Sequence, residues 1–408
     1  MPRLHRRTPI ALMLLASVVA GCGPDSASSG GDGDGDGDGD RSGDGDGDGN
    51  GDGDGDGDGN GNGDGDGDGN GNGDGDGDGD GDPSPSGDTL SDRYPGDVGL
   101  ADDPAVLFFD DFEAGWGRWD APGADTQYLS LLTDGASAHA GSGYLQSSVT
   151  RADLDATEYI SSQSHINFAD PVDVVYLRYY ARFVGTAPTP HHWVRMTAGV
   201  PGFNGSGRAN MVPAGDEGFW FDFDANTDDV FNFYVYWHRM RSGRCNDGST
   251  ASGCEGDQGS TYHYGNVFRP PAQAPFPRDA WFCIEMSARA NAVGGSDGAL
   301  AFWVDDQSVG DYRQGHPDGT WLRDSFHTGG CEFSACTAPQ PFEGFDFRSS
   351  ADVQFKGFVL DAYYERGSSA NRRATLEDRG IVVSDAQTVL YDDVVIATER
   401  VGCRRTDP

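Results

Sequence analysis

The chain has 408 residues and a formal net charge of −39, from 67 acidic and 28 basic side chains. A protein this acidic is a poor partner for nucleic acid or for an anionic membrane surface, so we expect neither interaction. Only one cation is a lysine, Lys356, so almost every positive charge is an arginine, whose planar group suits carboxylate binding.

Residues 1–21 have the features of a targeting signal. Three arginines, at 3, 6 and 7, precede an apolar stretch at 10–20 that is too short to span a bilayer, and VAGC follows at 19–22. This start resembles bacterial lipoprotein signal peptides, which implies cleavage before Cys22 and lipidation of that cysteine. The residue after the cysteine is Gly23 and not Asp, which resembles lipoproteins that Gram-negative bacteria sort to the outer membrane. We therefore expect a lipid-anchored outer-membrane protein, surface-exposed or periplasmic. The alternative is an ordinary secretory signal with an incidental cysteine.

Residues 22–94 are predicted to be a disordered linker. Between residues 31 and 82 the sequence is almost entirely Gly-Asp, with 20 aspartates and one arginine, and it has no apolar side chain with which to form a core. Mutual repulsion of the carboxylates favours an extended tether, although repeated carboxylates could also collect Ca²⁺ loosely. Residues 83–408 keep a net charge of −22, and the folded domain is predicted at 95–408.

The cysteines indicate an oxidising compartment. With Cys22 lipidated six remain, and six cysteines allow fifteen pairings. The simplest scheme closes two loops locally, by Cys245–Cys254 and Cys331–Cys336, and leaves Cys283 to pair with Cys403. A zinc site formed by His327, Cys331 and Cys336 is the alternative, but it lacks a CxxC motif and a fourth ligand.

The folded part is predicted to be all-β. Alternating or apolar runs separated by Gly, Pro, Asn and Asp clusters occur at residues 106–112, 144–149, 174–183, 192–198, 219–223, 230–240, 281–290, 300–304, 353–364 and 388–397. One short helix is expected at residues 371–378. Many short strands in one stretch predict a single antiparallel β-sandwich, which we expect to be a monomer.

Three of these runs combine an apolar face with a polar, aromatic one. The period of two buries Phe231, Phe233, Val235 and Trp237 in one run and Val175, Leu177, Tyr179, Ala181 and Phe183 in another. It places opposite them Asn232, Tyr234, Tyr236, His238, Tyr176, Arg178, Tyr180 and Arg182. In the third run His191, Trp193 and Arg195 share a face. We therefore predict one polar sheet face, built by all three strands, that binds a polymer.

The two ends of the domain carry a family resemblance. Residues 107–119, LFFDDFEAGWGRW, and 389–403, VLYDDVVIATERVGC, are similar to the first and last strands of concanavalin-like jelly rolls. The resemblance is greatest to extracellular glucuronan-lyase-like proteins and their cellulose-induced fungal relatives. It implies a structural Ca²⁺ held by Glu113 and by Asp392 or Asp393, with loop oxygens from residues 134–142. Solvated acids at strand ends are the alternative.

The same resemblance implies β-elimination on a uronic-acid polysaccharide. That reaction needs a group that neutralises the sugar carboxylate, a base and an acid. By strand facing, we assign neutralisation to Arg178, Arg182 and Arg195, the base to His191 or His238, and the acid to Tyr234 or Tyr236. Further substrate contacts are predicted from Tyr180, Trp193, Asn232, Glu285 and Arg289.

Other functions must be weighed against this one. A lone histidine on a strand is more often structural, and alternating Tyr and Arg can be cross-strand pairs that stabilise an exposed sheet. A retaining glucanase would show an ExDxxE motif, which Asp222, Asp224, Asp305 and Asp306 do not form, and no GxSxG motif marks a serine hydrolase. A carbohydrate-binding protein without catalysis is the main alternative to the lyase.

Overall fold

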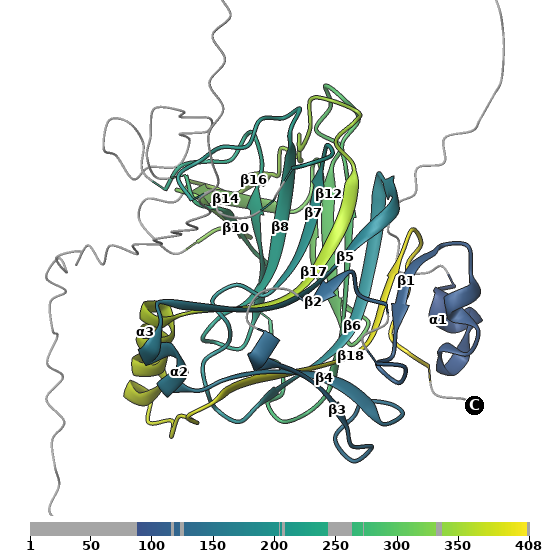
Figure 1. The fold of residues 1–408 in the computed structure, drawn as a ribbon. Helices are drawn as coiled ribbons and strands as arrows, with labels where there is room; N and C mark the ends of the chain where they lie inside the picture. The colour runs from purple at the N-terminus through teal and green to yellow at the C-terminus, as the bar shows by residue number, and fades with distance from the viewer. Residues whose placement is uncertain are drawn as a thin grey trace, which may run out of the picture. The chain divides into compact units, whose positions relative to one another are not determined.

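The computed structural model describes residues 88–115, 118–122, 126–203, 205, 209–243, 263–271, 273–331 and 337–405. These residues form two β-sheets with a few short helices at their ends (Figure 1). The signal peptide and residues 22–87 of the predicted linker, Cys22 among them, lie outside the described residues, as do Cys245, Cys254 and Cys336. Residues 88–94, predicted as the end of that linker, are described and contain a capped helical turn at Leu90–Arg93. In the described part no helix is long and apolar enough to cross a membrane.

The smaller sheet has eight strands, and all its pairings are antiparallel. Its order is β13 (Gln307–Tyr312), β12 (Ala299–Val304), β11 (Phe282–Arg289), β6 (Val174–Val184), β18 (Gln387–Ala397), β4 (Gly143–Val149) and β3 (Leu129–Thr133). β1 (Val106–Asp110) also pairs with β18. The first and last predicted strands therefore lie side by side.

The larger sheet has ten strands and carries the site described below. Its order is β16 (Gln340–Pro341), β14 (Asp318–Leu322), β15 (Ser325–Thr328), β10 (Asn266–Arg269), β9 (Phe231–Tyr236), β8 (Gly218–Ala225), β7 (Val194–Gly199), β17 (Phe355–Glu365), β5 (Tyr159–Val172) and β2 (Ala121–Pro122). The pairing of β10 with β15 is parallel, and the other pairings are antiparallel.

The helices are short and mostly capped by side chains. α1 (Leu90–Arg93) and α2 (Arg151–Ala156) both begin with a capping box, in which a threonine and the aspartate three residues later bond each other's backbone N–H. α3 (Arg366–Asp378) begins five residues before the predicted helix. Three 3₁₀ turns complete the set: η1 (Pro95–Asp97), η2 (Leu100–Asp102) and η3 (Thr126–Tyr128).

The core lies between the two sheets and is rich in aromatic side chains. The predicted inward positions of β6 and β9 are all buried, and β8 contributes Phe219, Phe221 and Phe223. Burying a phenylalanine stabilises the fold by about 1.5–3 kcal/mol, so this layer is the main stabilising feature of the sandwich. The all-β, jelly-roll prediction is confirmed, and each of the ten predicted runs overlaps a strand.

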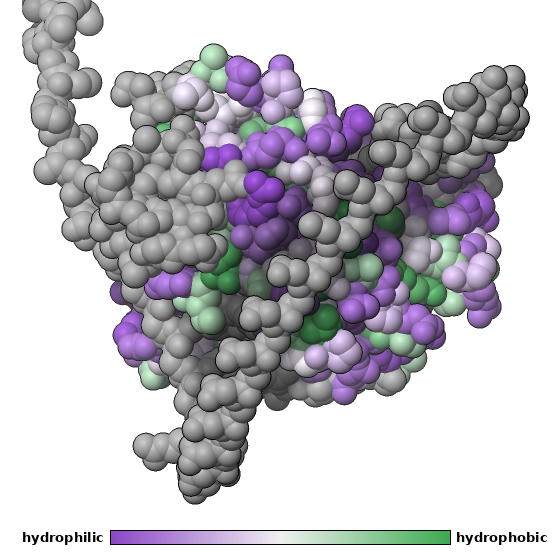
Figure 2. All heavy atoms as spheres, turned by 90° about the horizontal axis from the view of Figure 1, so that it is seen from above, coloured by the Kyte–Doolittle hydropathy of each residue, from purple (hydrophilic) through white to green (hydrophobic). Residues whose placement is uncertain are grey.

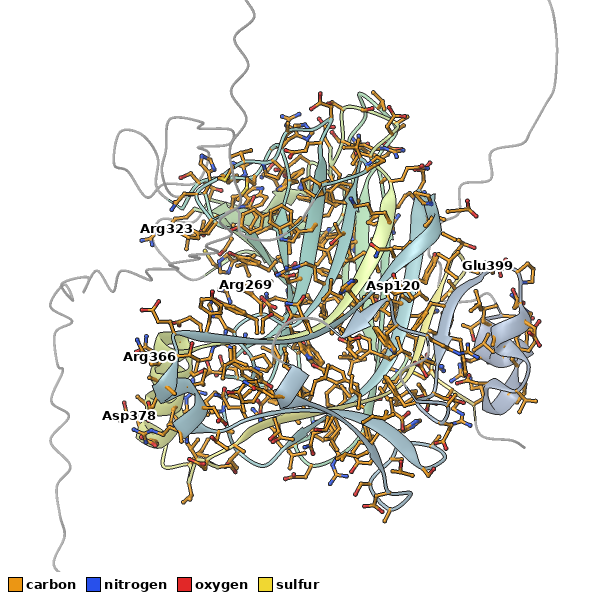
Figure 3. The ribbon with its side chains drawn as sticks, in the orientation of Figure 1. Asp120, Arg269, Arg323, Arg366, Asp378 and Glu399 are labelled. Carbon is orange, nitrogen blue, oxygen red and sulfur yellow. A yellow bond between two sulfur atoms is a disulfide. The ribbon has the colours of Figure 1, made fainter. Side chains whose placement is uncertain are left out.

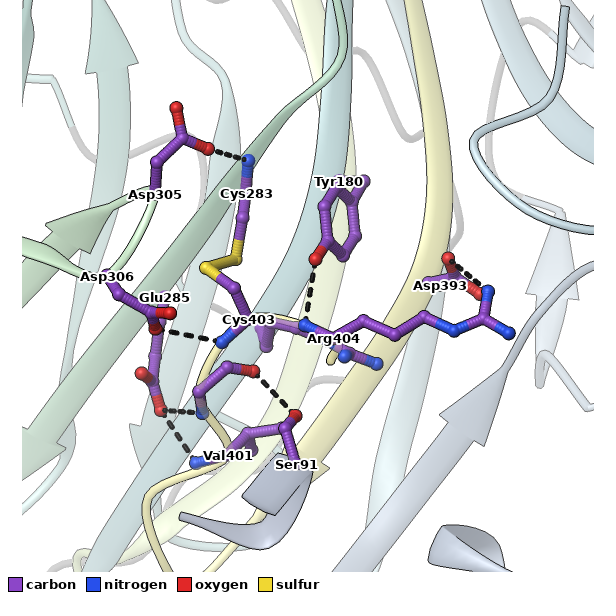
Figure 4. The surroundings of a disulfide bond; sticks show 12 residues. Ser91, Tyr180, Cys283, Glu285, Asp305, Asp306, Asp393, Val401, Cys403 and Arg404 are labelled. Carbon is purple, nitrogen blue, oxygen red and sulfur yellow. Dashed lines mark hydrogen bonds and ion pairs between the residues drawn. A yellow bond between two sulfur atoms is a disulfide. The ribbon is translucent and has the colours of Figure 1, made fainter. Parts of the chain in front are cut away.

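A disulfide bond joins β11 to the segment that follows β18. Cys283 and Cys403 are bonded, at a sequence separation of 120, as the simplest pairing scheme predicts (Figure 4). Around it, Glu285 accepts hydrogen bonds from the backbone N–H groups of Val401 and Gly402, and the Tyr180 hydroxyl accepts one from Arg404. Cys331 is also disulfide-bonded, which excludes it as a zinc ligand.

The prediction that three strands share one polar face is wrong. β7 and β9 belong to the larger sheet, separated only by β8, but β6 lies in the smaller sheet, between β11 and β18. Alternation in a sequence shows which residues face the core. It does not show which of the two sheets a strand joins, because both sheets of a sandwich present the same pattern.

Candidate functional site

Polar side chains gather on the outer face of the larger sheet, opposite the core. We call His192, Arg195, Asp222, Asp224, Tyr234, Tyr236 and Asp361 the central cluster. The strand register brings them together, because Arg195 of β7 pairs with Asp222 of β8, and Asp222 pairs in turn with Tyr234 of β9. Asp361 comes from β17, which pairs with β7 on the other side. Four neighbouring strands thus contribute to one site.

Arg195 and Asp222 form a partly buried ion pair with two hydrogen bonds. Arg195 donates from Nε to Asp222 Oδ1 at 2.6 Å and from Nη2 to Asp222 Oδ2 at 3.3 Å. Burial favours the neutral guanidinium, but Asp222 and more distant carboxylates outweigh it and raise the pKa of Arg195. The side chain therefore remains a cation held in a fixed direction, with Nη1 not engaged by Asp222.

His192 and Asp224 form a second pair beside the first. Nδ1 of His192 lies 3.1 Å from Asp224 Oδ2, and the other carboxylate oxygen accepts the backbone N–H of Trp193 at 2.9 Å. Burial would lower the pKa of His192, but the Asp224 and Asp222 carboxylates raise it above its usual value. With Nδ1 oriented by Asp224, Nε2 is the nitrogen available to a ligand.

Tyr234 lies between His192 and the next strand. Its ring centroid is 4.7 Å from that of His192 and 5.6 Å from that of Tyr236. A Cβ atom at position 265 would come within 2.5 Å of the Tyr234 ring, so the glycine there is what lets the ring lie against the backbone. Burial raises the pKa of Tyr234 well above its usual value, so the hydroxyl keeps its proton at neutral pH.

Asp361 is a buried carboxyl group with few partners. Only 2% of its surface is exposed, and the Ser161 hydroxyl lies 3.3 Å from Oδ1. Burial raises its pKa to about 7, although Arg195 opposes the change. A group with such a pKa can carry or release a proton near neutral pH, which is typical of functional sites.

The structure places four of the five predicted catalytic residues in or beside this cluster. Arg195, Tyr234 and Tyr236 belong to it, and the ring of His191 lies 4.3 Å from that of His192. His191 hydrogen-bonds Ser368 of α3, and burial, His192 and Arg372 lower its pKa well below its usual value.

His238, the other predicted base, lies elsewhere. It follows the end of β9, with Nδ1 at 3.3 Å from the Phe347 carbonyl and Nε2 at 3.6 Å from Asp346. Strand alternation placed it on the face of Tyr234 and Tyr236, but the strand ends at Tyr236, so the alternation does not extend to position 238.

Most of the predicted substrate-binding residues lie away from the cluster. Those on β6 and β11 belong to the smaller sheet: Arg178, Tyr180, Arg182, Glu285 and Arg289. Arg178 has no exposed surface and is paired with Asp97 at 2.7 Å, while Glu285 is equally buried and bonded to Arg400. These two are structural, because the N- and C-terminal segments of the domain cover the outer face of that sheet.

The other two predicted substrate-binding residues, Trp193 and Asn232, lie in different places. Trp193 is fully buried in the core, where its indole N–H donates to the Tyr391 hydroxyl at 2.6 Å, so it cannot stack on a sugar. Its position precedes β7, so the alternation of the strand does not apply to it. Asn232 is close to the cluster, because it pairs in register with Asp224.

The three predicted calcium ligands lie around one loop. Glu113 accepts N–H groups of Ser142 and Gly143, and Asp392 accepts those of His139 and Ala140. Burial and the neighbouring Asp393 raise the pKa of Asp392 to about 8. Among the described residues no three His, Cys, Asp or Glu side chains are grouped as metal ligands, so an ion here would also need loop oxygens.

Sequence reasoning missed His192, Asp222, Asp224 and Asp361 as functional residues. A signal for two of them was present, because residues 219–224, FWFDFD, alternate phenylalanine with Trp and Asp. Carboxylates at the outward positions of so apolar a strand need a partner when buried. No local signal marks Asp361, since its neighbour Arg195 is on another strand far away in sequence.

No protein-family model matches the chain, and no curated protein shows a significant match. Among solved structures, the endo-β-1,4-glucuronan lyase of the fungus Trichoderma reesei is similar, with 14% identity and a TM-score of 0.39, over 72% of this chain and 95% of that one. An alginate lyase, vAL-1 from Chlorella virus, has 10% identity and a TM-score of 0.44, over 72% and 99%. The cellulose-induced protein Cip1 has 15% identity and a TM-score of 0.37, also over 72% and 99%.

The structural neighbours of this chain thus include polysaccharide lyases. At these identities and TM-scores, nothing about the reaction or the reacting residues follows for this chain.

Proposed function

We propose that this protein is a polysaccharide lyase that cleaves a uronic-acid polymer by β-elimination at the central cluster. The observation that supports it is the arrangement of Arg195, His192 and Tyr234 on one face, with the first two held by aspartates. Each side chain can meet one of the three requirements of the reaction: charge neutralisation, a base and an acid.

In the proposed reaction Arg195 binds the carboxylate of the sugar. This makes the proton on the adjacent ring carbon more acidic, because the guanidinium stabilises the negative charge that develops when the proton leaves. His192 takes that proton through Nε2. The electron pair forms a double bond in the ring, the glycosidic C–O bond breaks, and the Tyr234 hydroxyl gives its proton to the departing oxygen.

The carboxylates of the cluster favour this reaction over hydrolysis. A retaining glycosidase needs one free carboxylate as nucleophile and one protonated acid. Here Asp222 is bonded to Arg195, and Asp224 is bonded to His192 and to a backbone N–H. Both carboxylates are engaged in holding Arg195 and His192. Among the described residues of the cluster, Asp361 is the carboxyl group with no basic side chain as a hydrogen-bond partner.

The test is an assay of the purified protein on glucuronan, alginate, pectate and a neutral glucan, following the ultraviolet absorbance of the unsaturated uronate product. His192→Ala and Tyr234→Phe should each lower the rate about 10²–10⁴-fold, the usual contribution of a general base or acid. His238→Ala is the matched control and should retain the wild-type rate, because His238 lies outside the cluster.

The pH profile adds a second readout. His192 must be neutral to act as the base, and its pKa is raised above the usual value, so the rate should increase as the pH rises through that pKa. Polymer binding without any unsaturated product would refute the lyase and leave a carbohydrate-binding protein.

We also propose that Ca²⁺ binds where Glu113, Asp392 and Asp393 meet residues 134–142. The support is chemical. Asp393 has Arg404 and His139 as partners, whereas the bonds recorded for Asp392 come from backbone N–H groups, and its pKa is raised by burial and by Asp393. A cation beside Asp392 would offset this cost, and carboxylate and carbonyl oxygens are the ligands that Ca²⁺ prefers. The ion would brace β1 against β18 and has no role in the proposed reaction.

For the location of the protein, we propose a lipid anchor at Cys22 on the outer membrane, followed by the Gly-Asp linker. The support is the signal-peptide pattern at residues 1–22 and the lack of apolar side chains between residues 31 and 82. In this arrangement the linker holds the sandwich away from the membrane, where it can reach a polymer.

A further inference from the structure

A pocket of about 300 Å³ opens next to the central cluster, at the start of β9 and the end of β10. Asn232, Arg269 and Gln273 contribute polar groups to its lining, and Pro270 and Pro271 form part of its wall. Gln273 is fixed, because its side-chain amide both donates to and accepts from the backbone of Phe231, at 2.8 and 3.0 Å. The pocket is therefore a built feature at the ends of these two strands.

Arg269 is the cation of this pocket, and it has no ion pair among the described residues. Its side chain is exposed, although many other arginines of the domain are bonded to a carboxylate, among them Arg195, Arg278 and Arg348. The one acid that lines the pocket, Asp228, is bonded to Arg379 at 2.7 Å. In a domain with a net charge of −22, an arginine left without a partner is available to an anion from outside.

The register places this arginine in line with the central cluster. Asp224 pairs with Asn232, and β10 continues the row, since Phe268 pairs with Phe233 and Arg269 follows it. β8 and β10 are two strand spacings apart, or about 10 Å. His327 of β15 pairs with Arg269 on the far side and extends the row by one more strand. A sugar chain lying across the strands would pass from the cluster to the pocket.

We propose that this pocket is a second carboxylate subsite, in which Arg269 binds a uronate of the same polymer beyond the sugar held at the central cluster. The inference rests on the proposed function for the direction of the chain and extends it. Such a subsite makes the enzyme specific for polymers that carry carboxylates on successive sugars, since a forked guanidinium binds a carboxylate with two hydrogen bonds.

The test compares two variants with the same change in charge, Arg269→Gln and Arg323→Gln. Arg323 is the matched control, because it is also exposed, lies in the turn between β14 and β15 on the same side of the molecule, and does not line the pocket (Figure 3). Binding is measured by calorimetry with an oligoglucuronate hexasaccharide and with neutral cellohexaose. A His192→Ala background prevents cleavage.

Arg269→Gln should weaken oligoglucuronate binding about tenfold, and Arg323→Gln should leave it unchanged. Equal affinities for Arg269→Gln and its parent, or an equal loss in both variants, would overturn the subsite. If the protein with His192 intact forms no unsaturated product but its binding of oligoglucuronate depends on Arg269, the lyase is refuted and the subsite is retained. The two proposals therefore fail in different ways.

Discussion

At the scale of single residues, the site is held together by buried charge. Asp222 and Asp224 have no more than 7% of their surface exposed. Asp222 is bonded to Arg195 of the neighbouring strand β7, and Asp224 is bonded to His192 of the segment before it. Such pairs contribute little net stability, because desolvation offsets the attraction. Their effect is to fix the direction in which Arg195 and His192 point, which matters for binding and catalysis.

Asp361 differs from these two, since no basic side chain among the described residues is hydrogen-bonded to it. Its pKa is raised from 3.8 to about 7, so between these values the unfolded chain has lost the proton that the folded protein keeps. The stability of the wild type should therefore fall as the pH rises from about 4 to about 7. The difference between the two pKa values corresponds to at most roughly 4 kcal/mol.

The free energy of unfolding of Asp361→Asn, measured by chemical denaturation, should thus be higher than that of the wild type at pH 8. At pH 4 the two values should be similar. Asp352→Asn, which changes an exposed carboxylate, is the control and should show no such pH-dependent difference. Equal pH dependence of Asp361→Asn and the wild type would mean that Asp361 titrates normally in the folded protein.

At the scale of strands, alternation predicted the core well where the inward side chains are large and apolar. It failed for β5, where Ser162 and Ser164 are buried on the inward face and the strand has no apolar pattern to mark it. β5 nevertheless carries Ser161 and Gln163 to the side of Asp361. Long-range pairing with β17 therefore decides its conformation, and local propensity does not.

The junction of β1, the 134–142 loop and β18 is where the calcium proposal can be tested. Added Ca²⁺ should raise the midpoint of thermal unfolding, because a ligand of the folded state alone stabilises it by about 2.7 kcal/mol at a hundred times its Kd. A chelator should reverse the effect, and Asp392→Asn should abolish it. Asp352→Asn should respond like the wild type. If Ca²⁺ does not change the unfolding midpoint of the wild type, the calcium proposal is refuted.

At the scale of the whole molecule, charge and surface polarity suit a domain that works in water. Among the residues coloured in Figure 2, hydrophilic side chains predominate and hydrophobic ones are scattered in small groups. The coloured residues of that face form no broad apolar patch. The large aromatic side chains are instead buried between the sheets, and the Cys283–Cys403 bond ties the end of the chain to β11.

The anchoring proposal concerns the whole chain and has a direct test. In a Gram-negative bacterial host, the wild-type protein should incorporate labelled palmitate and fractionate with the outer membrane. Cys22→Ser should lose the label and leave the membrane fraction, because the acyl chains on Cys22 are the proposed attachment. Ser42→Ala, a change within the linker, should behave like the wild type. Retention of Cys22→Ser in the membrane would contradict a lipid anchor.

The sequence alone determined the sandwich class, the positions of ten strands and the inward faces of β6 and β9, because these follow from side-chain periodicity. The spacing of the cysteines made Cys283–Cys403 part of the simplest pairing scheme, and the structure confirms that bond. The sequence also indicated Arg195, Tyr234 and Tyr236, which lie on outward positions of strands. The tertiary structure decided which sheet each strand joins. It thereby separated Arg178 from Arg195 and brought Asp361 and His192 to the site. Strand pairing between distant segments is a property of the whole chain, and local patterns cannot specify it.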